Sequence, residues 1–376
     1  MYYTVFQKEI EKQITWEDII FDKVSDFPVI SDHSSSGTIT RIVDKVPETN
    51  FSLVSTISAL KEFNIRNDGL FKIERHSLYE PFSIPKRSGG GYRKINKPKD
   101  NLMNTLRDLK FIIESNCGIM YHTAAYAYIK GRCPLDAVKK HQKFGSNWFL
   151  KTDFSDFFGS SSFTFVIEML EKIYPFNLIL KDEEGRKEML RALSLCFLDN
   201  GLPQGTPISP MLSNLIMIPI DHCLNQILSQ KAFCFTRYAD DITVSGVEKF
   251  DYTKVVKIIN GVLKEFKAPY VIKPEKTRFA AKAGPNWNLG VMLNKDNNIT
   301  IGHRKKKYFK AALCNFVCDQ KNGIQWLIDD VLELHGTLAY YESVEPDYFN
   351  YLIRHYNQKF KVDCIDLLKK AMSGVG

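Results

Sequence analysis

Several features that mark other classes of protein are missing from this sequence of 376 residues. Its eight cysteines include no Cys-x-x-Cys pair, and Cys314 and Cys318 have no second pair at zinc-ligand spacing, so a metal–thiolate site is not expected. No apolar run approaches the roughly 18 residues of a membrane span. The N-terminus, MYYTVFQKEIEKQ, lacks the basic and apolar regions of a signal peptide. Scattered cysteines beside apolar residues are typical of reduced proteins. We therefore expect a soluble, cytoplasmic protein with no membrane partner.

Neither sign of charge dominates the chain, whose net charge is +8, but cations gather in two places. Residues 86–110 hold eight Lys or Arg against two Asp, and HRKKKYFK (303–310) holds five without an acid. Such islands suit a polyanion, although each one alone is also consistent with solvated surface charge.

The chain has room for two or three packed subdomains, and it contains neither internal repeats nor low-complexity tracts. Hairpins are expected at 84–98, around Ser88-Gly89-Gly90-Gly91, and at 233–246. Periodicity and turn residues predict the other elements, which are a helix near 101–115, a strand at 146–154, a helix behind a Ser162 cap, a helix with Ser209 as N-cap and Pro210 as its first residue that is kinked at Pro219, a helix at 253–266, a strand at 288–293 and helices beyond 305. In the last region one apolar stripe is formed by Ile324, Leu327, Ile328, Val331, Leu334 and Leu338.

Three acids stand at the ends of the predicted strands. Asp153 closes the strand-like run SNWFLKTDF, and Asp240 and Asp241 form the tip of the hairpin FTRYADDITVSG. If neighbouring strands bring these carboxylates together, they stay ionised only where cations neutralise them. Hard divalent ions such as Mg²⁺ prefer oxygen ligands, and two such ions can activate an attacking hydroxyl and stabilise a leaving pyrophosphate. A solvated turn is the alternative for YADD alone.

Five blocks, in order along the chain, resemble those of reverse transcriptases, and the resemblance covers roughly residues 80–345. The blocks are KTDFSDFF (151–158), GLPQGTPISPMLSNL (201–215), RYADD (237–241), EKT (275–277) and NLGVML (288–293). The second closely resembles the loop-helix block of bacterial members, and the last resembles a primer-grip hairpin.

The resemblance implies an RNA-directed DNA polymerase with two Mg²⁺ ions, or Mn²⁺ in their place. It makes Asp153, Asp240 and Asp241 catalytic metal ligands, with the Phe154 carbonyl as a further donor and Asp241 as a weaker or outer ligand. Lys276 is expected near the leaving pyrophosphate, either as general acid or as a phosphate contact.

The nucleotide pocket is expected to combine cations, a loop and an aromatic ring. Lys86, Arg93 and Lys94 on the first hairpin would compensate triphosphate charge, and the loop at Gln204 and Gly205 would flank the incoming base. Where the family places an aromatic steric gate this chain has Phe158, which would exclude a 2′-hydroxyl and so favour deoxynucleotides. A core phenylalanine is the alternative.

Contacts with nucleic acid are expected from the C-terminal basic cluster, because Arg304, Lys305, Lys306 and Lys307 would grip the backbone of an RNA–DNA hybrid. Tyr238 would touch the primer or template backbone, or else pack within its hairpin. His141 is an RNA contact in one interpretation and a core histidine in the other.

The length disfavours retroviral and mobile-intron enzymes, and what remains resembles retron reverse transcriptases and their anti-phage, defence-associated relatives. Retrons carry Asn-Ala-x-x-His where this chain has Asp136-Ala137-Val138-Lys139-Lys140-His141, and Val-Thr-Gly where it has Asn288-Leu289-Gly290. These departures favour a defence-associated enzyme that copies a noncoding RNA template with deoxynucleotides. The alternatives are a true retron enzyme that makes branched RNA-linked DNA, and a catalytically silent RNA-binding scaffold. A partner protein or a homo-oligomer is left open.

The expected fold class is α+β, a right-hand polymerase with fingers, a palm containing an antiparallel sheet, and a helical thumb. The expected division is an N-terminal extension (1–60), fingers (61–145), palm with inserted finger elements (146–300) and thumb (301–376).

Overall fold

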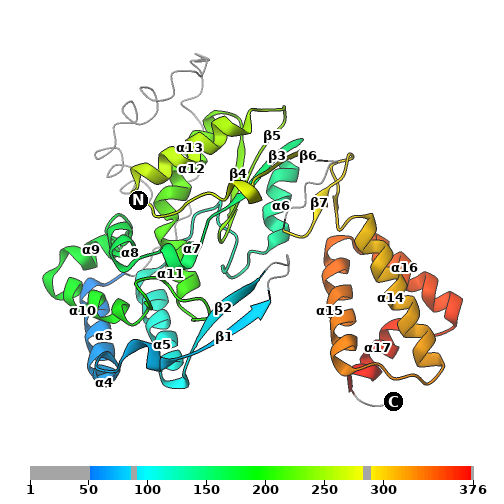
Figure 1. The fold of residues 1–376 in the computed structure, drawn as a ribbon, viewed down its shortest axis with the longest axis horizontal. Coiled ribbons are helices and arrows are strands. Elements are labelled where there is room, and N and C mark those ends of the chain that lie inside the picture. Colours follow the sequence, from blue (N-terminus) through cyan, green and yellow to red (C-terminus); the bar gives the residue numbers. More distant parts are fainter. Residues whose placement is uncertain (1–50, 86–90, 283–288, 374–376) are drawn as a thin grey trace. The chain divides into compact units, whose positions relative to one another are not determined.

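The computed structural model describes residues 51–85, 91–282 and 289–373 (Figure 1). These residues form two compact units, each discontinuous in sequence. The described part of the first unit comprises residues up to 132 together with 152–242 and 251–277. The second unit comprises 133–151, 243–250 and the residues from 278 onward. In this described part, no helix combines the length and apolar character needed to cross a membrane.

Most of the first unit is helical. Its elements include two short 3-10 turns, η2 (Arg75–Leu78) and η3 (Pro274–Lys276), and the helices α3 (Leu53–Arg66), α4 (Asp68–Phe71), α5 (Asp100–Cys117), α7 (Phe157–Ser160), α8 (Phe163–Leu170), α9 (Phe176–Lys181), α10 (Glu183–Ser194), α11 (Ser209–Ile216), α12 (Ile218–Gln230) and α13 (Tyr252–Glu265). The predicted helices at 101–115 and 253–266 are confirmed by α5 and α13. The expected domain boundary at residue 60 falls within α3.

Prolines and hydroxyl side chains set the helix ends much as the sequence indicates. Ser162 caps α8 by accepting a hydrogen bond from the Phe165 N–H, 3.3 Å away. Pro219 divides the predicted kinked helix into α11 and α12 and lies in the first turn of α12. One detail was wrong, because Ser209 is the first residue of α11 and Ile208 is its N-cap. The Ser209 hydroxyl instead pairs with Thr206, 2.6 Å away.

The N-terminal hairpin is longer than predicted. Strand β1 (Tyr79–Pro85) pairs antiparallel with β2 (Tyr92–Pro98), from Tyr79 opposite Pro98 to Pro85 opposite Tyr92. The turn between them, residues 86–90, lies outside the described residues. Most side chains of both strands are exposed, which leaves this hairpin's cations accessible.

A four-stranded sheet carries the predicted acids. Its strands are β3 (Trp148–Asp153), β4 (Cys234–Tyr238), β5 (Asp241–Gly246) and β6 (Arg278–Ala281), in the order β4-β5-β3-β6. Strands β3 and β6 are antiparallel, with Trp148 opposite Ala281. Asp153 is the last residue of β3 and Asp240 immediately precedes β5, so both acids lie at strand ends, as predicted.

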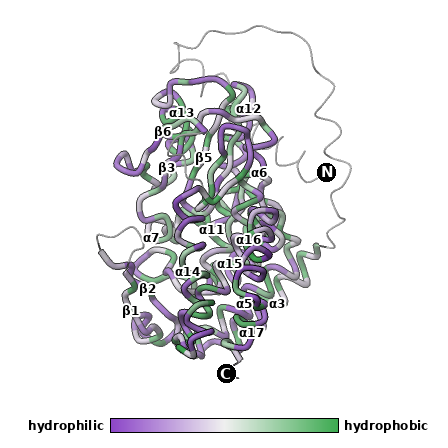
Figure 2. The backbone as a smooth tube through the Cα atoms, turned by 90° about the vertical axis from the view of Figure 1, so that its right-hand side faces the viewer, coloured by the Kyte–Doolittle hydropathy of each residue, from purple (hydrophilic) through white to green (hydrophobic). Residues whose placement is uncertain are grey.

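The second unit is built around a C-terminal helical group (Figure 1). It contains α6 (Pro134–Lys143), a small antiparallel pair of β7 (Met292–Leu293) and β8 (Ile299–Thr300), and the helices α14 (His303–Lys321), α15 (Ile328–Val344), α16 (Pro346–Phe360) and α17 (Cys364–Ser373). The four C-terminal helices share one core of buried residues, centred on Phe309, Phe316, Leu338 and Phe349. Hydrophilic and hydrophobic residues alternate along these helices, as helices that bury one face require (Figure 2).

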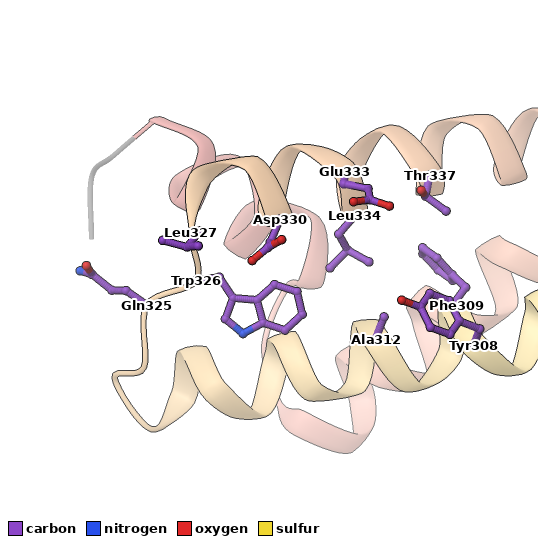
Figure 3. A pocket seen from close by; sticks show the side chains of 10 residues that line it. All are labelled: Tyr308, Phe309, Ala312, Gln325, Trp326, Leu327, Asp330, Glu333, Leu334 and Thr337. Carbon is purple, nitrogen blue, oxygen red and sulfur yellow. The ribbon is translucent and has the colours of Figure 1, made fainter. Parts of the chain in front are cut away.

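The predicted apolar stripe of α15 is only half buried. Val331, Leu334 and Leu338 lie in the core, whereas Leu327 and Ile328 at the start of the helix are exposed. The loop before α15 turns Trp326 inward, where its indole N–H donates to Asp319, 2.9 Å away. A cavity of about 480 Å³ lies beside this indole, between α14 and α15 (Figure 3). The tryptophan therefore packs where the stripe predicted aliphatic contacts.

Truncation of Leu338 tests this core. We expect Leu338→Ala to destabilise the helical group by about 2–5 kcal/mol, because it leaves a cavity among buried neighbours. The matched change Leu332→Ala, at an exposed position of the same helix, is expected to stay within about 0.5 kcal/mol. Hydrogen exchange of α14–α17 measures both. Equal protection in the two variants would contradict this packing.

Candidate active site

The sheet brings the two predicted acid sites together. The Phe154 N–H, just beyond β3, donates to the Asp240 carbonyl across 3.2 Å. Asp153 is buried, with 5% of its surface exposed, whereas Asp240 is half-buried and Asp241 is exposed. Burial raises the pKa of Asp240, and the nearby charge of Asp153 raises it further. The two acids therefore feel the mutual repulsion that the sequence predicted.

Lysines supply positive charge to this cluster. The short turn η3 and the residue before it place Lys276 and Lys273 beside Asp153. The Lys276 ammonium forms an ion pair with Asp153 Oδ2, and the Lys273 ammonium lies 3.8 Å from Oδ1. The hydrogen bond to Asp153 raises the pKa of Lys276, which holds this side chain in its charged form. Lys273 was not predicted, although it stands three residues before Lys276.

The donors at this cluster fit a hard divalent cation. Asp153 Oδ1 is buried and accepts no hydrogen bond in the structure, so it remains available as a ligand. The Phe154 N–H points toward Asp240, and because the N–H and C=O of an extended residue face the same edge, its carbonyl points there too. Oxygen donors of this kind suit Mg²⁺.

The side chains at this site do not by themselves form a complete set of metal ligands. Among residues 51–85, 91–282 and 289–373, no three His, Cys, Asp or Glu side chains form a group arranged to hold a metal ion. Asp241 is exposed at the start of β5, and Lys276 is bound to one oxygen of Asp153. Ammonium groups and metal ions are therefore alternative ways to neutralise the same carboxylate.

Phe158 stands beside a second aromatic residue that was not predicted. Its ring lies 6.3 Å from that of Tyr128, and its carbonyl accepts the Leu202 N–H at 3.0 Å. Burial raises the pKa of Tyr128, and the charge of Asp240 raises it further. Tyr128 has a left-handed backbone with φ of 59°, which is unusual for a side chain of this size. Such strain is a signal that only the structure reveals.

The loop before α11 is pressed against β2. The Asn96 N–H donates to the Gln204 carbonyl at 2.8 Å, and Gly205 has φ of +111°. A Cβ at Gly205 would lie 2.8 Å from the Ile95 side chain, so only glycine fits. The close backbone approach that this glycine allows is made to β2 in this structure.

The predicted cations of the first hairpin are accessible where they are described. Arg93 and Lys94 are exposed on β2, opposite Ile84 and Ser83. The charge of Arg93 opposes the rise in the pKa of Tyr128 that burial causes. Lys86 lies outside the described residues.

Residues 84–327 match the family described as "Reverse transcriptase (RNA-dependent DNA polymerase)", which is more than half of the chain. This chain belongs to the reverse transcriptase family. The family's enzymes are RNA-directed DNA polymerases, which use an RNA template and depend on divalent metal ions.

Known retron enzymes are similar to this reverse transcriptase over most of their length. The retron Ec83 reverse transcriptase of Escherichia coli is 27% identical over 301 residues, which cover 77% of this chain and 91% of that protein. The retron Ec73 enzyme of the same organism is 28% identical over 292 residues, covering 74% and 87%. These relatives support a bacterial, retron-like reverse transcriptase.

One solved telomerase, from Candida albicans in complex with a fragment of telomeric RNA, aligns with a TM-score of 0.43 and 15% identity. The alignment covers 85% of this chain and 62% of that one. That likeness is too distant to bear on function.

In the second unit of this reverse transcriptase, the four basic residues at the start of α14 differ in exposure. Arg304 and Lys307 are exposed. Lys305 donates to the Gly290 carbonyl at 2.6 Å. Lys306 pairs with Glu345 at 2.5 Å and lies over the Tyr348 ring. The two exposed cations are thus the better placed for a nucleic-acid backbone.

His141 lies in the core of the second unit with no exposed surface, so it is the core histidine of the two interpretations. Its Nδ1 is 2.6 Å from the Ser245 hydroxyl. The neighbouring departure from the retron pattern has a structural role, because Asp136 accepts the Cys133 N–H at 2.9 Å and so completes a capping box at the start of α6.

Burial of His141 should make stability depend on pH. Burial lowers its pKa to about 3, from an ordinary value near 6.5. Between pH 6.5 and pH 3 the unfolded chain therefore binds a proton at this histidine that the folded chain does not. The free energy of unfolding is unaffected above pH 6.5 and falls below it by about 1.4 kcal/mol per pH unit, until the pH approaches 3. Urea unfolding at pH 7 and pH 5 should show this loss in the wild type and not in His141→Gln. Parallel pH curves for the two proteins would contradict it.

Proposed function

We propose that this reverse transcriptase copies a noncoding RNA template into DNA by two-metal nucleotidyl transfer at Asp153 and Asp240. The observation that carries this proposal is that the neighbouring strands β3 and β5 bring Asp153 and Asp240 together, where the Phe154 N–H donates to the Asp240 carbonyl and a buried Asp153 oxygen accepts no hydrogen bond. Carboxylates buried close together are unfavourable without cations, so the arrangement makes sense where cations bind.

The residues have distinct proposed roles. Asp153 and Asp240 would hold the metals together with the Phe154 carbonyl, and the exposed Asp241 would be a weaker or outer ligand. Two Mg²⁺ ions, or Mn²⁺ in their place, would supply the Lewis acidity that activates the primer hydroxyl and stabilises the leaving pyrophosphate.

Lys276 and Lys273 are proposed to neutralise negative charge at the site, first on Asp153 and then on the bound nucleotide. In the structure both ammonium groups lie beside Asp153 and neutralise its charge. With nucleotide bound, the Lys276 ammonium would turn to the pyrophosphate, as a phosphate contact or as its general acid. A lysine ammonium is protonated at neutral pH, so it can give its proton to the leaving group as that group develops charge.

Deoxynucleotides are the proposed substrates. Phe158, backed by Tyr128, would fill the space that a 2′-hydroxyl needs, while Gln204 and Gly205 would lie beside the incoming base. Lys86, Arg93 and Lys94 would compensate the triphosphate. The two exposed cations on β2 support this role.

The RNA–DNA hybrid is proposed to contact Tyr238 at the end of β4 and the basic start of α14. Arg304 and Lys307 would carry most of the backbone contact, with Lys305 and Lys306 released from their internal partners or contributing charge at a distance. In this scheme residues 61–145 act as fingers, 146–300 as palm and 301–376 as thumb.

We also propose that the enzyme works in the bacterial cytoplasm in anti-phage defence. The departures at Asp136 and Leu289 from the retron pattern support a defence-associated enzyme with its own RNA. The likeness to the retron Ec83 and Ec73 enzymes favours branched RNA-linked DNA as the second candidate product. Sequencing the nucleic acid that co-purifies with the protein separates the two.

Replacement of one acid tests the proposed chemistry. We expect Asp240→Asn to lower deoxynucleotide incorporation at least about a thousandfold, or about 4 kcal/mol of barrier, because it removes a charged ligand without changing shape. Incorporation by purified protein with its RNA, Mg²⁺ and labelled nucleotides measures this. Asp329→Asn, at an exposed position of α15, is the control. Activity retained in Asp240→Asn would refute the proposal, and loss of phage protection in the same variant would link activity to defence.

The steric gate has its own test. Phe158→Ala is expected to lower the preference for deoxynucleotides over ribonucleotides about tenfold to a hundredfold, since an apolar pocket discriminates through volume. Phe158→Tyr, which keeps the bulk, should retain the preference. Competition between labelled dCTP and CTP measures the ratio. If Phe158→Ala leaves the ratio of dCTP to CTP incorporation unchanged, Phe158 is an ordinary packing residue and not a steric gate.

A further inference from the structure

An arginine with no exposed surface lies directly behind the turn that bears Asp240. Arg237 is on β4, three residues before that acid, and 0% of it is exposed. Its main partner, Asp221 on α12, is equally buried, and Asn214 on α11 is 1% exposed. None of the three side chains can touch a nucleotide from such a position.

The guanidinium is fully satisfied by these partners. Its Nε donates to Asp221 Oδ1 at 2.8 Å and its Nη2 to Oδ2 at 2.7 Å, the forked geometry of a strong ion pair. Nη1 and Nη2 both donate to Asn214 Oδ1 at 3.2 Å. The remaining Nη1 hydrogen goes to the Ala239 carbonyl at 3.0 Å, so every N–H of the group is used.

That last bond falls on a strained residue. Ala239 has φ of 56°, in the left-handed region that side chains avoid, and it is the residue immediately before Asp240. Strained backbone persists where surrounding contacts hold it in place. Through Ala239, the arginine fixes the direction in which the chain enters Asp240.

The same network reaches the aromatic pair. The Asn214 amide donates to the Ala127 carbonyl at 2.7 Å, and Ala127 precedes Tyr128, whose ring faces Phe158. The Arg237 backbone adds two bonds to this segment, to the Ala124 carbonyl at 2.7 Å and from the Tyr126 N–H at 2.9 Å. One buried group therefore ties the Asp240 turn to the wall of the proposed nucleotide pocket.

Stability alone is a weak reason for such a group. Replacing a buried ion pair by apolar residues of similar volume is often neutral or stabilising, whereas removing one partner is strongly destabilising. A role that needs the charges themselves, and their directions, is the better explanation.

We propose that Arg237, Asp221 and Asn214 form a positioning network that holds Asp240 in the geometry needed for catalysis. The inference rests on the proposed catalytic role of Asp240. Because the network lies behind the turn, its loss should lower kcat and raise the Mg²⁺ concentration for half-maximal activity, while leaving the affinity for template–primer unchanged.

The decisive variant is the double replacement Asp221→Leu/Arg237→Met, which removes both charges together and leaves neither unpaired. We expect a thermal midpoint near that of the wild type, a kcat at least tenfold lower, and a template–primer Kd within twofold. A matched double variant, Asn64→Leu/Glu188→Met, removes another buried polar pair of the same unit, whose amide–carboxylate distance is 2.6 Å. Its kcat should stay within twofold of the wild type.

The variant Arg237→Lys provides a second test, which does not require the double variant to fold. A lysine keeps a charge for Asp221 but cannot reach Asn214 and Ala239 at the same time. The expected result is again a kcat at least tenfold lower and a raised Mg²⁺ requirement.

Folded Arg237→Lys or double-variant protein with kcat within twofold of the wild type would overturn the inference. So would an equal loss in the Asn64/Glu188 control, or a template–primer Kd weakened as much as kcat. Asp240→Asn, assayed in parallel, tells the two failures apart. If Asp240→Asn is inactive while the network variants keep their kcat, only the positioning role is wrong; if Asp240→Asn stays active, the proposed function itself is wrong.

Discussion

The repulsion between Asp153 and Asp240 is the constraint that organises the site. Strands β3 and β5 place the two acids side by side at their ends, one of them buried. Two such carboxylates are tolerated only with positive charge beside them, and Lys273 and Lys276 supply it in this structure. The same requirement explains why the donors suit divalent cations, on which the reverse transcriptase family depends.

Around this pair, backbone contacts do most of the shaping. The loop before α11 meets β2 at Gly205. It meets α7 at Gly201, where a Cβ would lie 2.3 Å from the Gly159 carbonyl oxygen. The Phe158 carbonyl is held by the Leu202 N–H. These contacts fix the loop before α11 to β2 and to the backbone around Phe158.

Individual residues show which features of the fold could be predicted from sequence patterns and which could not. The strand ending in Asp153, the Ser162 cap and the break at Pro219 were all predicted, because each depends on neighbours a few residues away. The half-buried stripe of α15 was not, because Trp326 from the preceding loop fills the place of aliphatic side chains. His141 illustrates a pattern that left two interpretations open until its burial was known.

The sequence by itself determined the order of elements, the family and the identity of the acids, since these follow from local periodicity and from short motifs. Only the tertiary structure decided which residues support them. Lys273, Tyr128 and the Arg237–Asp221 pair come from segments separated along the chain, and no local rule relates their positions. The sequence around Arg237 does not identify its partner, which could be found only in three dimensions, where a buried charged group needs one.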